Sequence, residues 1–218
     1  MKLALFDLDN TLIAGDSDCL WGEFLSEHGY VDSEAYQEGH EKYYTDYLNG
    51  ELNIAEFLKF QLKALADNDR EQLERWREKY IEEKIKPVIL PKAKELIERH
   101  RKQGHELLII TATNRFITQP IADELNIKHL IACEPEIIDG QYTGQVIGTP
   151  SFAEGKVTRF NEWLKKFKHN PEEIWFYSDS HNDIPLLQVA DHAIAVDPDA
   201  TLIAAAEKNG WAIISLRQ

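Results

Sequence analysis

The sequence predicts a doubly wound, Rossmann-like α/β fold with an all-helical module inserted after the first strand. Short apolar runs recur along the chain, and helical patterns separate most of them, which favours a parallel sheet with helices on both faces. The runs lie at residues 2–8, 106–111, 129–133, 173–178, 192–196 and 211–215. Residues 14–87 interrupt the alternation with amphipathic helical patterns and no convincing strand. We therefore expect a core domain from residues 1–13 and 88–218 and a helical cap domain from residues 14–87.

The helical patterns fall into two groups. They cover residues 17–29, 33–48, 54–66 and 69–84 in the inserted module, and residues 91–103, 115–126, 156–168 and 199–209 after it. The pattern at 91–103 begins at Pro91 and stops at Gly104, the asymmetry typical of helix ends. Residues 134–148 differ, because glycines separate short β-prone pieces there, and they predict a small hairpin.

The chain is strongly acidic. It has 218 residues, with 24 Lys and Arg against 38 Asp and Glu and a net charge of −14. Such a chain repels nucleic-acid backbones and acidic membrane surfaces at long range, so we expect neither as a partner. It also repels small anions. A phosphate site must therefore supply its own positive charge from a metal ion, a lysine or main-chain N–H groups.

Other features of the composition predict a cytoplasmic protein. No apolar stretch approaches the length of a membrane-spanning helix. The N-terminal apolar run is too short for a signal peptide and is interrupted by Asp7 and Asp9. Cys19 and Cys133 form neither a metal-type pair nor a disulfide framework, so we expect two reduced thiols.

The first predicted strand ends in two acidic residues, Asp7 and Asp9, within the run DLDNT at 7–11. Doubly wound folds bind ligands at the carboxyl ends of their strands. Two carboxylates two residues apart leave a strand on the same side and need a cation or a shared proton. A solvated turn is the alternative. A calcium loop would need Asp or Asn at position 11 and Gly at position 12, where this chain has Thr11 and Leu12.

The run at 173–178 ends in a second acidic segment, SDSHND at 178–183. Taken alone, Asp179 or Asp183 could be a helix N-cap that stabilises a first turn. Two acidic strand exits in one parallel sheet are harder to explain in that way. Together they offer the oxygen ligands that Mg²⁺ takes, often one or two carboxylates with substrate phosphate and water.

Two further positions suit a phosphate site. The strand at 106–111 ends in Thr111, whose hydroxyl can donate to a phosphate oxygen; an ordinary β-branched strand end is the alternative. Lys156 opens a helix directly after Gly155, where its charge works against the helix macrodipole. That conflict indicates another role for the lysine, the alternative being an exposed side chain.

The order of these motifs resembles that of the haloacid dehalogenase (HAD) superfamily of phosphohydrolases. Asp-x-Asp-x-Thr, a strand-end threonine, a lysine and Asp-x-x-x-Asp follow one another in the family's order across the whole chain. The helical module resembles the cap of the phosphoserine-phosphatase-like branch, and residues 180–183 are similar to that branch's fourth motif. Residues 197–211 resemble bacterial members that include histidinol-phosphatases.

The resemblance implies a Mg²⁺-dependent phosphatase that acts on a small phosphorylated metabolite. Asp7 would attack phosphorus and become an aspartyl phosphate, and Asp9 would protonate the leaving alkoxide and then activate the hydrolytic water. Mg²⁺ would be held by the Asp7 carboxylate, the Asp9 carbonyl oxygen and Asp179. Dehalogenases of the superfamily lack the second aspartate, so Asp9 favours phosphoryl chemistry.

Other residues would hold the phosphoryl group. By the same resemblance, Thr111, Lys156 and Asn182 would contact its oxygens, and Asp183 would support the metal shell or Lys156. This set is physically coherent, because a carboxylate approaches a phosphate dianion only when charge is neutralised, here by Mg²⁺ and Lys156.

The resemblance also narrows the substrate. Phosphoserine phosphatases carry a cap carboxylate, seven residues after the second aspartate, that binds the substrate amine, and this count leads to Asp16. Their cap arginine, which pairs with the substrate carboxylate, is matched by Gln61, and an amide does not replace a guanidinium. Lys59 or Lys63 could compensate. The pattern favours an amine without a carboxylate, as in histidinol phosphate, with Trp21 stacking on its imidazole; phosphoserine is the alternative.

Two other classes of protein share parts of this pattern. A phospho-receiver signalling domain also has a doubly wound sheet, a phosphorylated aspartate, Mg²⁺, threonine and lysine, but it is much shorter and has no inserted cap. A binding module with a vestigial site would lack turnover, yet all the expected catalytic groups are present. Within the superfamily, phosphotransfer in place of hydrolysis stays open.

Overall fold

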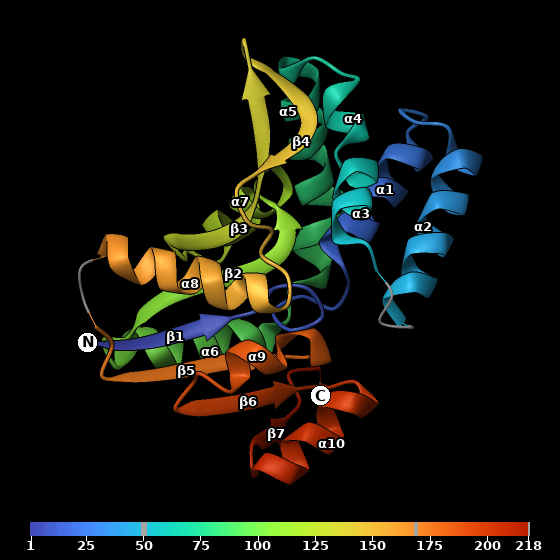
Figure 1. Ribbon diagram of the computed structural model, residues 1–218. Coiled ribbons are helices and arrows are strands. Elements are labelled where there is room, and N and C mark those ends of the chain that lie inside the picture. Colours follow the sequence, from blue (N-terminus) through green and yellow to red (C-terminus); the bar gives the residue numbers. More distant parts are fainter. Residues whose placement is uncertain (49–51, 168–169, 218) are drawn as a thin grey trace.

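The computed structural model describes residues 1–48, 52–167 and 170–217, and a seven-stranded sheet forms its centre (Figure 1). The strand order is β4-β3-β2-β1-β5-β6-β7. Neighbouring strands run parallel, except that β3 and β4 are antiparallel. The strands are β1 (Lys2–Phe6), β2 (Glu106–Asn114), β3 (His129–Ile138), β4 (Gln141–Ile147), β5 (Glu173–Ser178), β6 (His192–Val196) and β7 (Ala212–Ile214). The predicted doubly wound α/β fold is confirmed.

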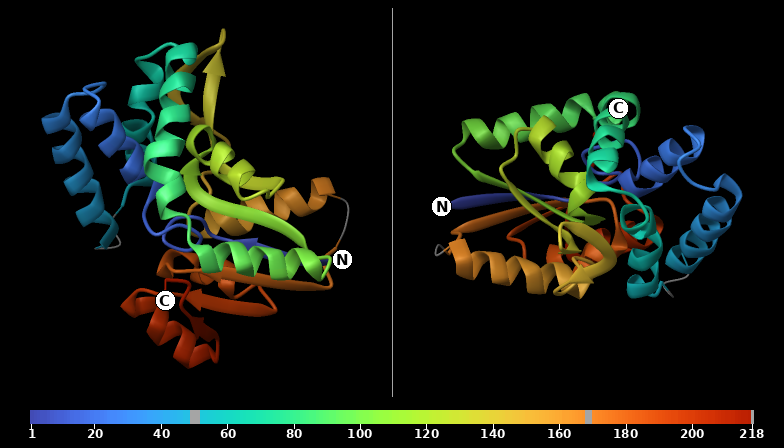
Figure 2. Two further views of the ribbon diagram at one scale, coloured as in Figure 1. Left: turned by 180° about the vertical axis from the view of Figure 1, so that it is seen from behind. Right: turned by 90° about the horizontal axis from the view of Figure 1, so that it is seen from above.

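Two apolar layers cover the two faces of the sheet, because successive residues of a strand point to opposite sides. On β1, Leu3 and Leu5 pack into one layer, and Ala4 and Phe6 pack into the other. The Phe6 layer contains α6 (Pro91–Lys102) and α7 (Arg115–Glu124); the Leu5 layer contains α8 (Glu154–Phe167), α9 (Ile184–Leu187) and α10 (Ala200–Asn209). Figure 2 shows the sheet between these layers. The central strands are therefore buried on both faces, as parallel sheets require.

The central strand, β1, marks the point where the chain changes direction across the sheet. It pairs with β2 on one side and with β5 on the other. The chain first builds outward through β2, β3 and β4, and then crosses to β5, β6 and β7 on the opposite side. The carboxyl ends of β1, β2 and β5 thus meet at a topological switch point, where doubly wound folds bind ligands.

The segment between β1 and α6 is helical. It contains α1 (Ser17–Glu27), α2 (Ser33–Leu48), α3 (Ile54–Gln61), α4 (Lys63–Ala66), α5 (Arg70–Tyr80), the π-helical η1 (Ile81–Ile85) and the 3₁₀ turn η2 (Lys86–Val88). None of the described residues in 14–87 belongs to a strand of the sheet. The predicted helix at 54–66 is two helices that meet at Leu62. An isolated bridge between Ile13 and Ile89 joins the segments where the chain leaves and rejoins the core.

One side of this helical segment shares its core with the sheet. Trp21 of α1 packs edge-on against Tyr80 of α5 and Phe116 of α7, with ring centroids 5.2 and 5.8 Å apart. Inside this cluster the Tyr80 hydroxyl donates to the carbonyl oxygen of Ser17 at 2.8 Å. α1 and α5 are thereby fixed to the core.

Across the described chain, no helix combines the length and apolar character that a membrane crossing needs.

The predicted hairpin at 134–148 is present, but its first strand is the continuation of β3 of the main sheet. β3 runs without a break from His129 to Ile138, and β4 returns along it with a register shift between Pro135 and Ile137. β4 then packs beside α3 and α4, where Gly144 lies against Ala66. The hairpin therefore joins the edge of the sheet to the inserted helices (Figure 1).

Candidate active site

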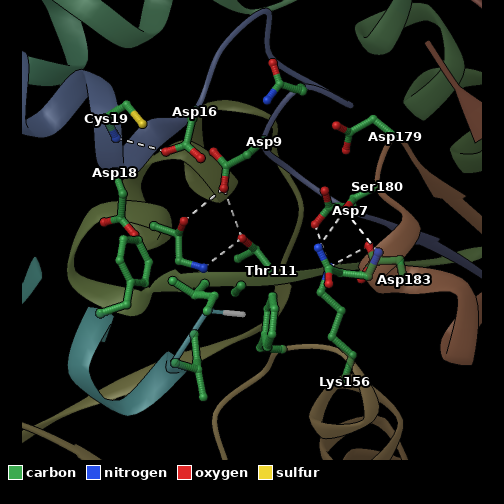
Figure 3. A pocket seen from close by; sticks show the side chains of 18 of the residues that line it. Asp7, Asp9, Asp16, Asp18, Cys19, Thr111, Lys156, Asp179, Ser180 and Asp183 are labelled. Atoms are coloured by element: carbon green, nitrogen blue, oxygen red, sulfur yellow. Dashed lines mark hydrogen bonds and ion pairs between the residues drawn. The ribbon is translucent and has the colours of Figure 1, made fainter. Parts of the chain in front are cut away.

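A cavity of about 200 Å³ lies at the switch point, between the strand ends and the inserted helices (Figure 3). The core lines it with Asp7, Asp9, Thr111, Thr113, Phe152, Lys156, Asp179, Asn182 and Asp183. The inserted helices and their flanking loops line it with Asp16, Asp18, Cys19, Tyr43, Leu52, Ile54 and Phe57. The structure thus brings together predicted residues that are far apart in the sequence.

Asp7 lies directly beyond β1, and its N–H donates to the carbonyl oxygen of Tyr177 at 2.9 Å. Its buried side chain accepts a hydrogen bond at Oδ1 from Lys156 Nζ at 2.8 Å. The same Nζ donates to Asp183 Oδ2 at 2.7 Å, and the Ser178 hydroxyl donates to that oxygen at 2.7 Å. One buried ammonium is therefore shared by two carboxylates from different strand exits.

Burial acts in opposite senses on the acids and on the lysine of this network. Burial raises the pKa of Asp7 to about 7; Lys156 opposes that shift, and the charges of Asp183 and Asp9 add to it. Burial lowers the pKa of Lys156, but the charges of Asp183 and Asp7 outweigh it and hold the pKa above its usual range. Lys156 stays protonated at neutral pH. Any further positive charge in the cavity favours the ionised, nucleophilic form of Asp7.

Asp9, on the turn after β1, is held by three donors. The N–H of Ser17, at the start of α1, donates to its Oδ1 at 2.7 Å. The hydroxyls of Thr113 and Thr111 donate to its Oδ2 at 2.9 and 3.3 Å. Burial and then the charge of Asp16 raise the pKa of Asp9 to about 7. A carboxyl group whose pKa lies near neutral pH can both give and accept a proton.

Asp179 follows β5 and is tied to the loop after β1. The Thr11 hydroxyl donates to Asp179 Oδ1 and accepts from the N–H of Asp179, both at 3.1 Å. Burial, followed by the charges of Asp7 and Asp183, raises the pKa of Asp179 to about 8. The carboxylates of this site thus lie close together, and the positive charge beside them is too small to hold their pKa values in the usual range.

The donor atoms at these strand exits fit Mg²⁺. The carboxylates of Asp7 and Asp179 and the main-chain carbonyl of Asp9 are oxygen donors, the kind that Mg²⁺ prefers. Within the described ranges, no three acidic, histidine or cysteine side chains group as a metal site. A set of two carboxylates and one carbonyl, completed by water and substrate, is usual for Mg²⁺. A divalent cation here would reverse the raised pKa values of both carboxylates.

Trp21 and Gln61, which we predicted to contact the substrate, do not line the cavity. Trp21 is 1% exposed and packs against Tyr80. Gln61 is 4% exposed, and its Oε1 accepts from the Tyr36 hydroxyl at 3.3 Å. The Trp21 ring is enclosed by Phe24, Tyr80 and Phe116, so it is not open to the cavity. The predicted stacking role of Trp21 is wrong for this reason.

Asp18, Thr113 and Phe152 are among the lining residues that the sequence analysis did not assign to the site. A signal was present for two of them. Asp18 follows Asp16 at the same spacing that separates the first acidic pair, and Thr113 follows Thr111 at the same spacing. Phe152 carries no such signal, because aromatic residues line protein cores as often as they line binding sites.

A buried ammonium beside carboxylates at a switch point is suited to phosphoryl transfer. The fold and the site together therefore indicate an enzyme that acts on phosphate esters. Residues 4–188 match the model of haloacid dehalogenase-like hydrolases, and the chain belongs to this family. The chain is 42% identical to a histidinol-phosphatase of Neisseria meningitidis, over 99% of either chain. It is 30% identical to a phosphoserine phosphatase of Mycobacterium tuberculosis, over 98% of this chain and 70% of the relative. The protein is a phosphomonoester hydrolase, which excludes the receiver-domain alternative.

Solved structures share the fold. A Bordetella pertussis protein of unknown function matches with a TM-score of 0.94 and 39% identity, over 99% of this chain and 98% of that one. A phosphoserine phosphatase, solved as an analogue of its phospho-aspartyl intermediate, matches with a TM-score of 0.71 and 22% identity. That second match covers 100% of this chain and 94% of the other.

Gly155 sets the position of Lys156 and gives a test of the ion-pair network. A Cβ at residue 155 would overlap the main-chain carbonyl oxygen of Pro150, which cannot swing away. Gly155→Ala should displace the start of α8 and move Lys156 off Asp7, lowering kcat about 10²-fold. Steady-state hydrolysis of a generic phosphomonoester measures the effect. Glu154→Ala, an exposed change in the same turn, is the matched control, and equal kcat values for the two variants would contradict the argument.

Proposed function

We propose that this phosphatase hydrolyses histidinol phosphate to histidinol and phosphate by way of a phosphoryl group carried on Asp7. The observation that carries the mechanism is the buried Asp7 carboxylate at 2.8 Å from Lys156 Nζ, on the wall of the cavity. An Asp7 oxygen attacks phosphorus, and the bond from phosphorus to the ester oxygen of the substrate breaks. Asp9 gives its proton to the departing alkoxide, which leaves as the alcohol.

A water molecule completes the cycle. It attacks phosphorus, Asp9 takes its proton, and Asp7 leaves as a carboxylate while phosphate is released. Lys156 stabilises the negative charge on the phosphoryl oxygens in both steps, with Thr111 and Asn182 as hydrogen-bond donors on the same cavity wall. Asp183 positions Lys156 through their bond at 2.7 Å. Mg²⁺ supplies further positive charge when bound.

We also propose that residues 14–87 act as a cap over a core made of residues 1–13 and 88–218. The support is that α2 and α3 contribute Tyr43 and Phe57 to the cavity wall opposite the strand ends. A cap in this position excludes water from the reacting centre and selects among substrates by their shape and charge.

The charges of the cavity favour an amine-bearing substrate without a carboxylate. Among the described residues that line the cavity, Lys156 is the only cation, and two carboxylates already engage it. Lys59 and Lys63, the candidates to replace the missing arginine, line other cavities, and Lys63 pairs with Asp67. A substrate carboxylate would therefore stay unpaired in a buried site, which is strongly unfavourable.

The remaining wall suits an imidazole ring. Tyr43, Phe57 and Phe152 line the cavity and offer aromatic faces or edges to a flat heterocycle. The 42% identity with the Neisseria histidinol-phosphatase supports the same substrate. Phosphoserine is the second candidate, supported by the 30% identity with a mycobacterial phosphoserine phosphatase.

Asp7→Asn should lower kcat by about 10⁴-fold or more, because an amide oxygen is a poor nucleophile towards phosphorus. Release of inorganic phosphate measures turnover, and circular dichroism checks that the nearly isosteric variant is folded. Asp139→Asn, in the exposed hairpin turn, is the matched control and should keep wild-type kcat. Near-wild-type turnover by Asp7→Asn would overturn the mechanism.

Activity should disappear in the presence of a chelator and return when Mg²⁺ is added, because the crowded carboxylates need a cation to bind a phosphate ester. Asp179→Ala removes one oxygen donor, so the Mg²⁺ concentration for half-maximal activity should rise about tenfold or more. A titration of activity against free Mg²⁺ measures both effects. Full activity in the chelator would show that these carboxylates serve another purpose.

The kcat/KM for histidinol phosphate should exceed that for phosphoserine by about 10²-fold, because the described residues of the cavity offer no free counter-ion to a substrate carboxylate. Asp16→Asn should weaken the use of histidinol phosphate; the amide can still accept the hydrogen bond from Cys19 that caps α1. Both values come from steady-state kinetics at fixed Mg²⁺. A clear preference for phosphoserine would change the substrate and leave the phosphatase mechanism standing.

A further inference from the structure

Asp18 is a second cap carboxylate on the cavity wall, and the proposed mechanism gives it no role. It lies in the first turn of α1, two residues after Asp16, and lines the cavity although it is only 3% exposed. Figure 3 shows Asp16 and Asp18 together at the end of the cavity away from Lys156. The cavity therefore has one end with a buried ammonium and another end with two carboxylates.

Among the described residues, no positive charge balances the end of the cavity that holds Asp16 and Asp18. Lys156, the only cation among the described lining residues, is bound to Asp7 and Asp183. Burial, with the charges of Asp16 and Asp9, raises the pKa of Asp18 well above its usual range. A buried carboxylate in this position is unfavourable unless it is protonated or meets a cation.

A purely structural role does not account for the charge of Asp18. The N-cap of α1 is Asp16, whose Oδ1 accepts from the N–H of Cys19 at 2.9 Å. Asp18 Oδ1 accepts from Asn114 Nδ2 at 3.2 Å. The amide of Asn114 is oriented by its own Oδ1, which accepts from the N–H of Ile117 at 3.3 Å, so Nδ2 faces Asp18. A neutral amide at residue 18 would accept the same hydrogen bond.

We propose that Asp18 is a specificity-determining residue that, together with Asp16, binds the ammonium group of an amino-alcohol phosphate. An ammonium group has three donors and one positive charge, so it can bond to both carboxylates and offset part of the negative charge at the end of the cavity that Lys156 does not reach. This inference rests on the proposed function, because a phosphate held by Lys156 directs the rest of the substrate towards α1. The same two carboxylates repel a substrate that carries its own carboxylate beside the amine.

Three phosphate esters test the proposal on the full-length, Mg²⁺-loaded enzyme. They are histidinol phosphate, its analogue without the amine, and 2-aminopropyl phosphate, which keeps the amine and lacks the ring. Asp18→Asn should raise KM about 10²-fold for both amine-bearing esters with kcat nearly unchanged, and should leave the amine-free ester unaffected. Glu23→Gln, on the exposed side of α1, makes the same change in charge and should leave all three unaffected.

The other outcomes overturn the proposal in distinguishable ways. An equal loss on all three esters would show that Asp18 only supports the structure. A loss confined to the ring-bearing esters would show that Asp18 contacts the imidazole, and no loss on any ester would show no contact at all. Absence of phosphate release by the wild-type enzyme from every ester would instead overturn the proposed function, and this inference with it.

Thermal unfolding without substrate provides a second readout. Asp18→Asn should hold or raise the midpoint temperature relative to the wild type, because it removes a buried carboxylate that has no counter-ion among the described residues. A structural role predicts the opposite, since the variant would then lose a stabilising interaction. A midpoint clearly below that of Glu23→Gln would overturn the proposal.

Discussion

The sharing of one buried ammonium between two carboxylates is the interaction on which the rest of this structure depends. Lys156 Nζ lies 2.8 Å from Asp7 Oδ1 and 2.7 Å from Asp183 Oδ2, and so joins the exits of β1 and β5 to the start of α8. Removing it would leave two buried carboxylates unpaired, which is strongly destabilising. The close main-chain packing at Gly155 permits this position of the lysine. Together with a bound cation, the same ammonium would offset the negative charge of the site towards a phosphate, in a chain with a net charge of −14.

The cavity is electrostatically divided, and the division follows from the elements that meet there. The strand ends supply the carboxylates that would hold Mg²⁺, the ammonium of Lys156 bound to Asp7 and Asp183, and the hydroxyls of Thr111 and Thr113. The N-cap and first turn of α1 supply Asp16 and Asp18. A substrate with a phosphate at one end and a cationic group at the other is complementary to this arrangement, and complementarity of charge chiefly determines specificity. Aromatic residues on α2 and α3 and after β4 fill the space between the two ends.

Most of the fold could be predicted from the sequence, and so could most of the polar residues that line the cavity at the strand ends, because both depend on local patterns. Apolar runs separated by helical periods locate the strands, and acidic residues at the ends of two runs locate Asp7, Asp9 and Asp179. The errors have a physical cause as well. Trp21 sits in an apolar helix whose periodicity is clear, but periodicity does not tell which face meets the core and which meets the cavity. The same limit of sequence patterns applies to Gln61, whose side chain bonds to Tyr36.

The amino-acid sequence alone predicts that a doubly wound sheet forms and that acidic and hydroxyl side chains lie at the carboxyl ends of its strands. Strand exits and helix starts are properties of short segments, whose residues report on neighbours a few positions away. The packing of the whole chain was needed to show that Lys156 bonds to Asp7, 149 residues away, and that Asp18 lies on a cavity whose one cation, among the described lining residues, is Lys156. It also decided that the β3–β4 hairpin packs against α3 and α4. Contacts across such separations are set by how the helical and sheet layers pack, and no local pattern records that packing.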